Sequence, residues 1–221
     1  MYRPSEIALL RSGWKVNTRP YELNIVGLRS PSVRANKFDD TIYVFYYDAK
    51  GRVVEYNFPC TTDAGTFWLE NPYTPKGTAI LQQGQYAYQI GLHQGRYKAL
   101  VQKGQVNIRR DYDRNAILDF YNGTLYTGYF GINIHHAKDV GTTKVVDRWS
   151  AGCQVFANIQ DYNFFMSLCE KHRQLYGNHF LYGLIDMRAQ QRTLARRTLY
   201  AGVALSAFVY RKEIINYINA A

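Results

Sequence analysis

Residues 128 to 156 read GYFGINIHHAKDVGTTKVVDRWSAGCQVF, a stretch that contains one cysteine and two adjacent histidines. Its first part, Tyr129 to Ile134, alternates aromatic or branched side chains with small or polar ones, which predicts a strand that delivers His135 to its end. Cys153 follows a turn of small residues, Ser150-Ala151-Gly152. A thiol in such a turn suits covalent acyl chemistry, because the backbone N–H groups beside it can point at a substrate oxygen.

The composition describes a folded protein that is rich in β structure. Of the 221 residues, 47% are hydrophobic and 20% are charged, which excludes a disordered chain. Aromatic residues make up 15%, with 20 Tyr and 11 Phe, and such side chains favour strands. We therefore expect a mainly β (α+β) fold, and the length favours one domain with appendages.

Local patterns predict a series of strands and one long helix. Strand-like runs at 41–47 and 52–58 flank a turn at Asp48 to Gly51 and read as a hairpin, and another strand is expected over 21–28. Residues 59–81 read as a turn-rich passage that leads into a strand, and glycine-punctuated strands follow as a meander. Residues 159–176 have helical spacing of apolar side chains, and 180–185 read as a closing strand.

The two ends of the chain differ from the centre. Residues 1–20 are expected to be a helical segment, with a short helix over 4–14, and lack the pattern of a secretory signal, so we expect synthesis in the cytoplasm. Residues 188–221 contain six basic residues and one acidic residue and so contribute half of the net charge of +10. We expect this part to be a basic and apolar helical extension, too short in its uncharged run to span a bilayer, that packs on the domain or a partner, or anchors at a surface. The predicted domain lies between them, at 21–187.

The cysteines exclude a disulfide framework. There are three, Cys60, Cys153 and Cys169, without CxxC or CxxH spacing, so at least one thiol is unpaired. In a Cys–His pair the imidazole takes the thiol proton and a third group holds the other ring nitrogen. His135 or His136 can supply the base, although each could equally be a packed structural residue.

The order of three motifs resembles the L,D-transpeptidase catalytic domain, or YkuD family. The motifs are Thr-Pro-Lys-Gly-Thr-Ala-Ile at 74–80, Ile-His at 134–135, and Ser-x-Gly-Cys at 150–153. The resemblance covers about residues 21 to 186 and implies a YkuD-like β-sandwich or barrel with a few flanking helices. It implies a cysteine enzyme, without a cofactor or metal, that cleaves or transfers peptide bonds in the stem peptides of bacterial peptidoglycan.

The resemblance also assigns roles. His135 takes the place of the family's general base and Cys153 that of its nucleophile, which would form a thioester. The backbone N–H groups of Gly152 and Cys153 would form the oxyanion hole, and the carbonyl of His136 would lie near the His135 ring. Ala151 stands where the family usually has a second His, and Val155 where Asn or Arg is usual.

A more distant resemblance is to cell-wall hydrolases of bacteriophages, which are often basic and lack a signal peptide. It implies a lytic or virion-associated wall hydrolase that reaches the wall by lysis or in a phage particle. The partners would be peptidoglycan and, through 188–221, an anionic envelope surface or a virion protein; nucleic acid is disfavoured. Two alternatives stay open: a zinc-dependent muramoyl-alanine amidase, with His136 joined by Cys153, His172 or His179, and a structural or wall-binding virion protein without activity.

Overall fold

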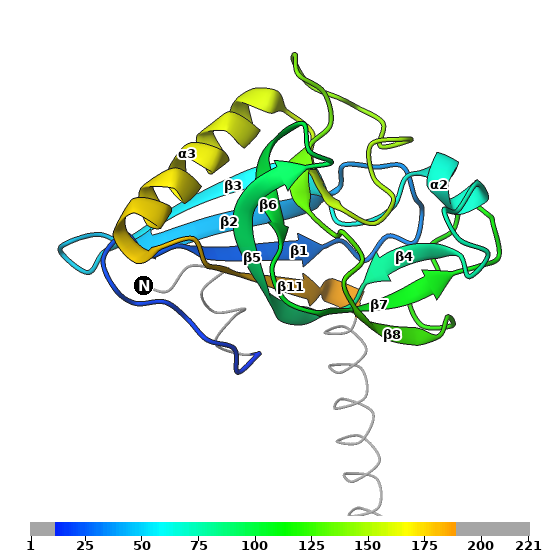
Figure 1. Ribbon diagram of the computed structural model, residues 1–221, viewed down its shortest axis with the longest axis horizontal. Helices are drawn as coiled ribbons and strands as arrows, with labels where there is room; N and C mark the ends of the chain where they lie inside the picture. The colour runs from blue at the N-terminus through cyan, green and yellow to red at the C-terminus, as the bar shows by residue number, and fades with distance from the viewer. Residues whose placement is uncertain (1–11, 189–221) are drawn as a thin grey trace, which may run out of the picture. The chain divides into compact units, whose positions relative to one another are not determined.

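The computed structural model describes residues 12–188. The chain divides into two compact units, Met1–Asp186 and Met187–Ala221, and the described strands and helices belong to the first (Figure 1). The elements, in chain order, are β1 (Asn24–Arg29), β2 (Asp40–Tyr47), β3 (Val53–Thr61), α2 (Thr66–Glu70), β4 (Thr78–Leu81), β5 (Gly84–His93), β6 (Tyr97–Gln102), β7 (Val106–Asp111), β8 (Leu125–Gly128), β9 (Ile134–His136), β10 (Gln154–Phe156), α3 (Ile159–Tyr176) and β11 (Phe180–Asp186).

The strands form a closed barrel and a small separate sheet. The barrel order is β1-β11-β5-β6-β9-β10-β3-β2, and the small sheet has the order β4-β7-β8. Most pairs are antiparallel, but β1 pairs with β11 and β9 pairs with β10 in parallel. The prediction of a mainly β fold with few helices is confirmed. The predicted meander describes β5–β6 and β7–β8 only, because β4, β7 and β8 leave the barrel for the second sheet.

The β2–β3 hairpin forms where the sequence places it. The carboxylate of Asp48 accepts hydrogen bonds from the backbone N–H groups of Lys50 and Arg52, at 2.8 and 2.9 Å, and Gly51 takes a positive φ of 72°. An acidic residue followed by such a glycine closes a tight turn at little steric cost. The strands pair in register from Asp40↔Cys60 to Tyr47↔Val53, which confirms the predicted hairpin.

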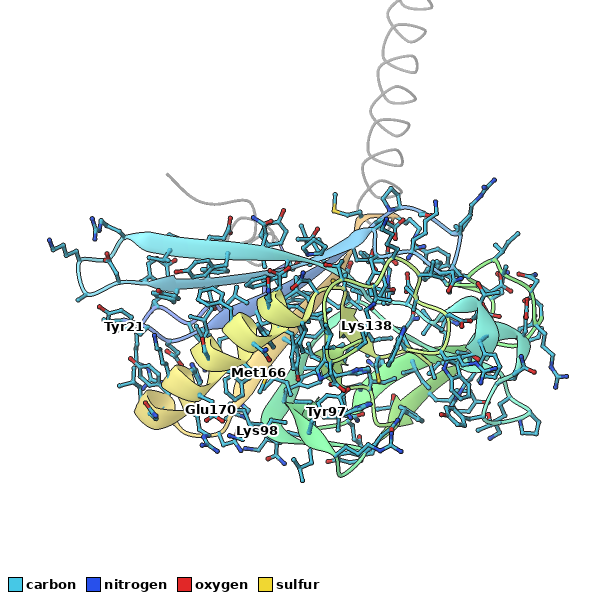
Figure 2. All side chains as sticks on the ribbon, turned by 90° about the horizontal axis from the view of Figure 1, so that it is seen from above. Tyr21, Tyr97, Lys98, Lys138, Met166 and Glu170 are labelled. Atoms are coloured by element: carbon cyan, nitrogen blue, oxygen red, sulfur yellow. The ribbon has the colours of Figure 1, made fainter. Side chains whose placement is uncertain are left out.

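Helix α3 covers one side of the barrel (Figures 1 and 2). It begins after Asn158, whose side chain accepts from two backbone N–H groups of the first turn, and it ends before Gly177. Its inner face packs on the core with the buried side chains Tyr162, Phe165, Met166, Leu168, Cys169 and His172. Its outer edge is joined to β6 by an ion pair of 2.9 Å between Lys98 and Glu170. The predicted bounds of this helix are confirmed, as is β11, which closes the barrel between β1 and β5.

One local prediction is wrong and another is incomplete. Residues 129–133 are not a strand: β8 ends at Gly128, Gly131 takes a φ of 69° that breaks the extended run, and β9 begins only at Ile134. The turn-rich passage predicted at 59–81 does lead into a strand, β4, but it also contains the end of β3, which continues to Thr61, and the short helix α2, which was not predicted. Five residues are too few to show helical periodicity in a sequence.

The termini lie mostly outside the described residues. Of the predicted helix over 4–14, the structure describes only residues 12–14, where Ser12 and Gly13 form a turn. The predicted extension at 188–221 lies outside the described residues except for Arg188. Within residues 12–188, no helix is long and apolar enough to cross a membrane.

Candidate active site

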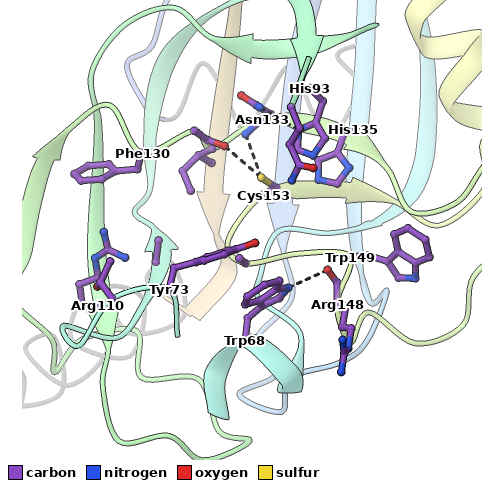
Figure 3. Close-up of a pocket in the computed structure, with 16 residues that line it drawn as sticks. Trp68, Tyr73, His93, Arg110, Phe130, Asn133, His135, Arg148, Trp149 and Cys153 are labelled. Atoms are coloured by element: carbon purple, nitrogen blue, oxygen red, sulfur yellow. Dashed lines mark hydrogen bonds between the residues drawn. The ribbon is translucent and has the colours of Figure 1, made fainter. Parts of the chain in front are cut away.

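The parallel pairing of β9 and β10 places the predicted nucleophile and base on one face. Val155 lies opposite His135, and the N–H of Gln154 donates to the carbonyl of Asn133 at 2.9 Å, so Cys153 lies beside Asn133. Side chains two residues apart on a strand point to the same side of the sheet. In Figure 3, the ring of His135 and the sulfur of Cys153 face the same space.

Cys153 is the one thiol of the three that reaches the surface. Cys60 and Cys169 are fully buried, and all three are free. The sulfur of Cys153 accepts the N–H of Asn133 at 3.4 Å, and the thiol donates to the carbonyl of Gly131, also at 3.4 Å (Figure 3). Burial of the sulfur raises the pKa of Cys153 to about 11, with the Asn133 N–H acting in the opposite direction. The resting side chain is therefore a thiol.

The tautomer of His135 is assigned by its neighbours. Its Nδ1 lies 2.8 Å from the backbone carbonyl of His136, which can only accept, so the proton sits on Nδ1. Within residues 12–188 the other nitrogen, Nε2, has no hydrogen-bond partner and is left as a base. Desolvation first, and then the nearby His93, lowers the pKa of His135 to about 3. The imidazole is therefore neutral at rest.

Two site residues that the sequence analysis missed come from the tip of the β5–β6 hairpin. His93 and Tyr97 face each other across the turn. The ring of His93 stacks on that of His135 with centroids 3.9 Å apart, and its Nδ1 lies 3.1 Å from the side-chain amide of Asn133. The hydroxyl of Tyr97 lies 3.1 Å from Nδ1 of His135 and 3.4 Å from the carbonyl of His136. Both residues hold the His135 ring in place.

The turn before Cys153 is braced from within. The hydroxyl of Ser150 donates to the carbonyl of Cys153 at 2.8 Å and accepts the N–H of Gly152 at 3.1 Å. The N–H of Gly152, one of the two expected oxyanion-hole donors, is therefore already engaged in this structure. Within the described residues, the N–H of Cys153 has no hydrogen-bond partner and remains available.

Gly152 is required at its position by close packing. Its φ is 119°, and a side-chain carbon there would lie 2.4 Å from the carbonyl oxygen of Ala79 on β4. The segment at 74–80 thus contributes by leading β4 against the nucleophile turn. Helix α2 also holds this region: the N–H of Gly65 donates to the carbonyl of Ser150 at 2.9 Å, and the indole of Trp68 to that of Arg148 at 2.9 Å.

The side chain of His136 lies outside the cavity, unlike that of His135, and Ala151 lines the cavity, unlike Ser150 and Gly152. The ring of His136 points to the opposite face from His135 and packs against Tyr97 and Tyr162, with centroids 4.2 and 4.8 Å away. Only its carbonyl reaches the candidate base. Ala151 lines the cavity in front of Cys153, whereas the buried Ser150 and Gly152 do not.

The cavity in front of the thiol has a volume of about 540 Å³. One wall is aromatic: the ring centroids of Trp68 and Tyr73 are stacked 4.1 Å apart, and Tyr73 is 71% exposed. The lining residues are Trp68, Tyr73, Thr74, Ala79, His93, Gln94, Arg110, Phe130, Gly131, Ile132, Asn133, His135, Arg148, Trp149, Ala151 and Cys153. The space is large enough for several residues of a peptide.

The ligand set of a zinc amidase is not assembled. His172 uses its Nδ1 to accept the N–H of Leu23 at 3.1 Å, and its Nε2 lies 3.0 Å from the carbonyl of His179. The ring therefore packs at the far end of α3 and is not directed at His136. Within residues 12–188, no group of three His, Cys, Asp or Glu side chains could hold a metal ion. The donors that the amidase alternative requires are therefore not brought together within the described residues.

Comparison of the chain with protein-family models, curated proteins and solved structures finds no match. The geometry itself defines a mainly β barrel that presents a Cys–His pair in a partly aromatic cavity. Such a pair, with one ring nitrogen held by a carbonyl, is equipped for general-base activation of a thiol.

Proposed function

We propose that this protein cleaves or transfers peptide bonds in the stem peptides of bacterial peptidoglycan through a Cys153 thioester, with His135 as general base. The supporting observation is the hydrogen bond from Nδ1 of His135 to the carbonyl of His136, which leaves Nε2 unprotonated in a cavity shared with Cys153. The closed β barrel and the order of its motifs favour a fold of the YkuD type.

The chemistry proceeds from a neutral pair. As the sulfur of Cys153 attacks the peptide carbonyl, Nε2 of His135 takes the thiol proton, which requires the thiol to turn away from the carbonyl of Gly131. The N–H of Cys153 donates to the oxyanion. The amine then leaves with the proton from Nε2, and a thioester remains.

The second half returns the enzyme to its starting state. Water, or the amine of another peptide, gives a proton to Nε2 and attacks the thioester carbonyl. The thiolate leaves and recovers the proton, giving hydrolysis or transfer respectively. We place the reaction in a phage lytic or virion-associated hydrolase, since the net charge of +10 favours an anionic envelope.

The proposal is tested on purified sacculi, which are incubated with the wild type and with Cys153→Ala, each with and without a chelator. Released fragments are identified by mass spectrometry. We expect cleavage by the wild type that resists the chelator and is lost in Cys153→Ala.

Each other outcome overturns the proposal in a different direction. Cleavage that the chelator abolishes indicates a metal enzyme. Wild-type protein that binds sacculi without releasing fragments indicates the structural or wall-binding protein. Circular dichroism of Cys153→Ala shows whether the variant is folded, so that loss of activity is not confused with loss of structure.

A further inference from the structure

Arg110 is a partly buried cation at one end of the cavity. It lies on β7, with its Nη1 donating to the carbonyl of Gly77 at 3.0 Å and its guanidinium 5.5 Å from the centroid of the Phe130 ring. Within residues 12–188, no carboxylate forms an ion pair with it. Burial lowers the pKa of Arg110, since partial removal from water disfavours the charged form.

The cavity offers this cation no internal counter-charge. No aspartate or glutamate of the described part of the chain lines it, and burial lowers the pKa of both His93 and His135, which disfavours a positive charge on either ring. The other arginine, Arg148, has its guanidinium over the ring of Phe67 at 3.8 Å, and Figure 3 shows its side chain directed away from Cys153. Arg110 is thus the cation that an occupant of the cavity would meet.

The two ends of the cavity are chemically distinct. Figure 3 shows Arg110 and Phe130 at one end, Cys153 with His93 and His135 at the other, and Tyr73 between them. A guanidinium has five N–H donors in a planar fork that matches a carboxylate, and within residues 12–188 only the hydrogen bond to the Gly77 carbonyl uses one of them. An uncompensated cation at the far end of a reaction cavity favours substrates that carry the opposite charge.

We propose that Arg110 is a specificity-determining residue that binds a carboxylate of the peptide whose carbonyl reacts with Cys153. The acyl donor is then an anionic peptide, held at its charged group by Arg110 and along its length by the aromatic wall. The effect of Arg110 on the reaction rate rests on the proposed thiol chemistry, whereas binding of the carboxylate by Arg110 does not. Arg110 contacts the substrate away from the reacting atoms and takes no part in proton transfer.

The kinetic test uses two synthetic stem peptides that differ only in a free carboxylate or its carboxamide. We expect the wild type to prefer the carboxylate, and Arg110→Gln to lose about 10- to 100-fold in kcat/KM on that peptide alone. Arg110→Lys keeps the charge without the fork and should fall between them. The loss should appear mainly in KM, since the contact is made before the reaction.

Arg109→Gln is the matched control. Arg109 is the neighbouring residue on β7, it is not among the cavity-lining residues, and its Nη1 donates to the carbonyl of Gly123 at 2.6 Å. This variant removes the same charge and one similar hydrogen bond from the same strand. Equal effects of the two substitutions would show a general loss of charge or stability and would overturn the inference.

A binding measurement separates this inference from the proposed function. In Cys153→Ala, titration of each peptide is followed by tryptophan fluorescence, because Trp68 lines the cavity. Arg110-dependent binding of the carboxylate peptide without cleavage by the wild type would support the anion site and reject the thiol chemistry. Cleavage of both peptides at rates that Arg110→Gln leaves unchanged, or binding of neither peptide, would overturn the anion site.

Discussion

At the scale of single residues, the site combines a thiol and an imidazole that are both neutral at rest. Burial acts on the two groups in opposite directions, raising the pKa of Cys153 to about 11 and lowering that of His135 to about 3. A thiolate–imidazolium pair would require the reverse order of pKa values. In the proposed reaction, the thiol therefore becomes nucleophilic only as its proton moves to Nε2.

This electrostatic state predicts the pH dependence of alkylation. The thiolate fraction of Cys153 should rise about tenfold per pH unit up to its pKa, so the rate with iodoacetamide should keep increasing between pH 7 and pH 10. Cys60 and Cys169 are buried, so little alkylation is expected at them. The Cys153→Ala variant is the control that measures any alkylation at these two thiols. A rate that is already at its plateau at pH 7 would mean a preformed ion pair and would refute the neutral state.

The sequence points to Cys153 and His135 but not to the residues that hold the His135 ring in place. Cys153 and His135 lie in one stretch, and their turn and strand contexts are local, so spacing alone brings them to attention. His93 and Tyr97 reach His135 only through antiparallel pairing of β5 with β6 and of β6 with β9. Asn133 was not predicted as a site residue for another reason: it lies in residues 129–133, whose sequence resembles a strand although the structure has none there. No local pattern encodes contacts of this kind.

At the scale of elements, the nucleophile turn depends on its fit against β4. Gly152→Ala should lower the free energy of unfolding by about 2 to 4 kcal/mol, because it adds a steric clash with the Ala79 carbonyl to an unfavourable φ. Gly95→Ala is the control. Gly95 also has a positive φ, 71°, but open space around it, so about 1 kcal/mol is expected there.

Denaturant unfolding of the two variants measures this difference. Equal losses would mean that only the backbone conformation matters and that the approach of β4 does not constrain the turn. Alanine has no side-chain rotamer that could move its Cβ away from the Ala79 carbonyl, so the side chain itself cannot relieve the clash.

The success of prediction also differs between elements. The β2–β3 hairpin and α3 carry their own signals, an Asp-Ala-Lys-Gly turn in one and regular spacing of apolar side chains in the other. Helix α2 has neither a side-chain cap nor enough length for periodicity. Its position is set by contacts with distant residues, such as the bond from Trp68 to Arg148, and these become visible only in the folded chain.

At the scale of the whole described domain, the site lies where the barrel meets the small sheet. β9 supplies His135, the turn before β10 supplies Cys153, the β5–β6 hairpin supplies the residues that hold the His135 ring, and β4 and β7 supply the packing of the turn and the cation Arg110. The sequence predicts the mainly β class, because composition and alternation are spread over the chain. The division into a barrel and a second sheet depends on pairings between distant strands, which composition does not specify.

The proposed mechanism requires that Cys153 forms a covalent acyl intermediate. The most direct measurement is the intact mass of the protein after brief mixing with a stem peptide, followed by peptide mapping. We predict a mass increase equal to the acyl part of the peptide, located on Cys153, removed by hydroxylamine and absent from Cys153→Ala. Cleavage of the same peptide by folded Cys153→Ala at the wild-type rate, with no adduct on the wild type, would contradict the account.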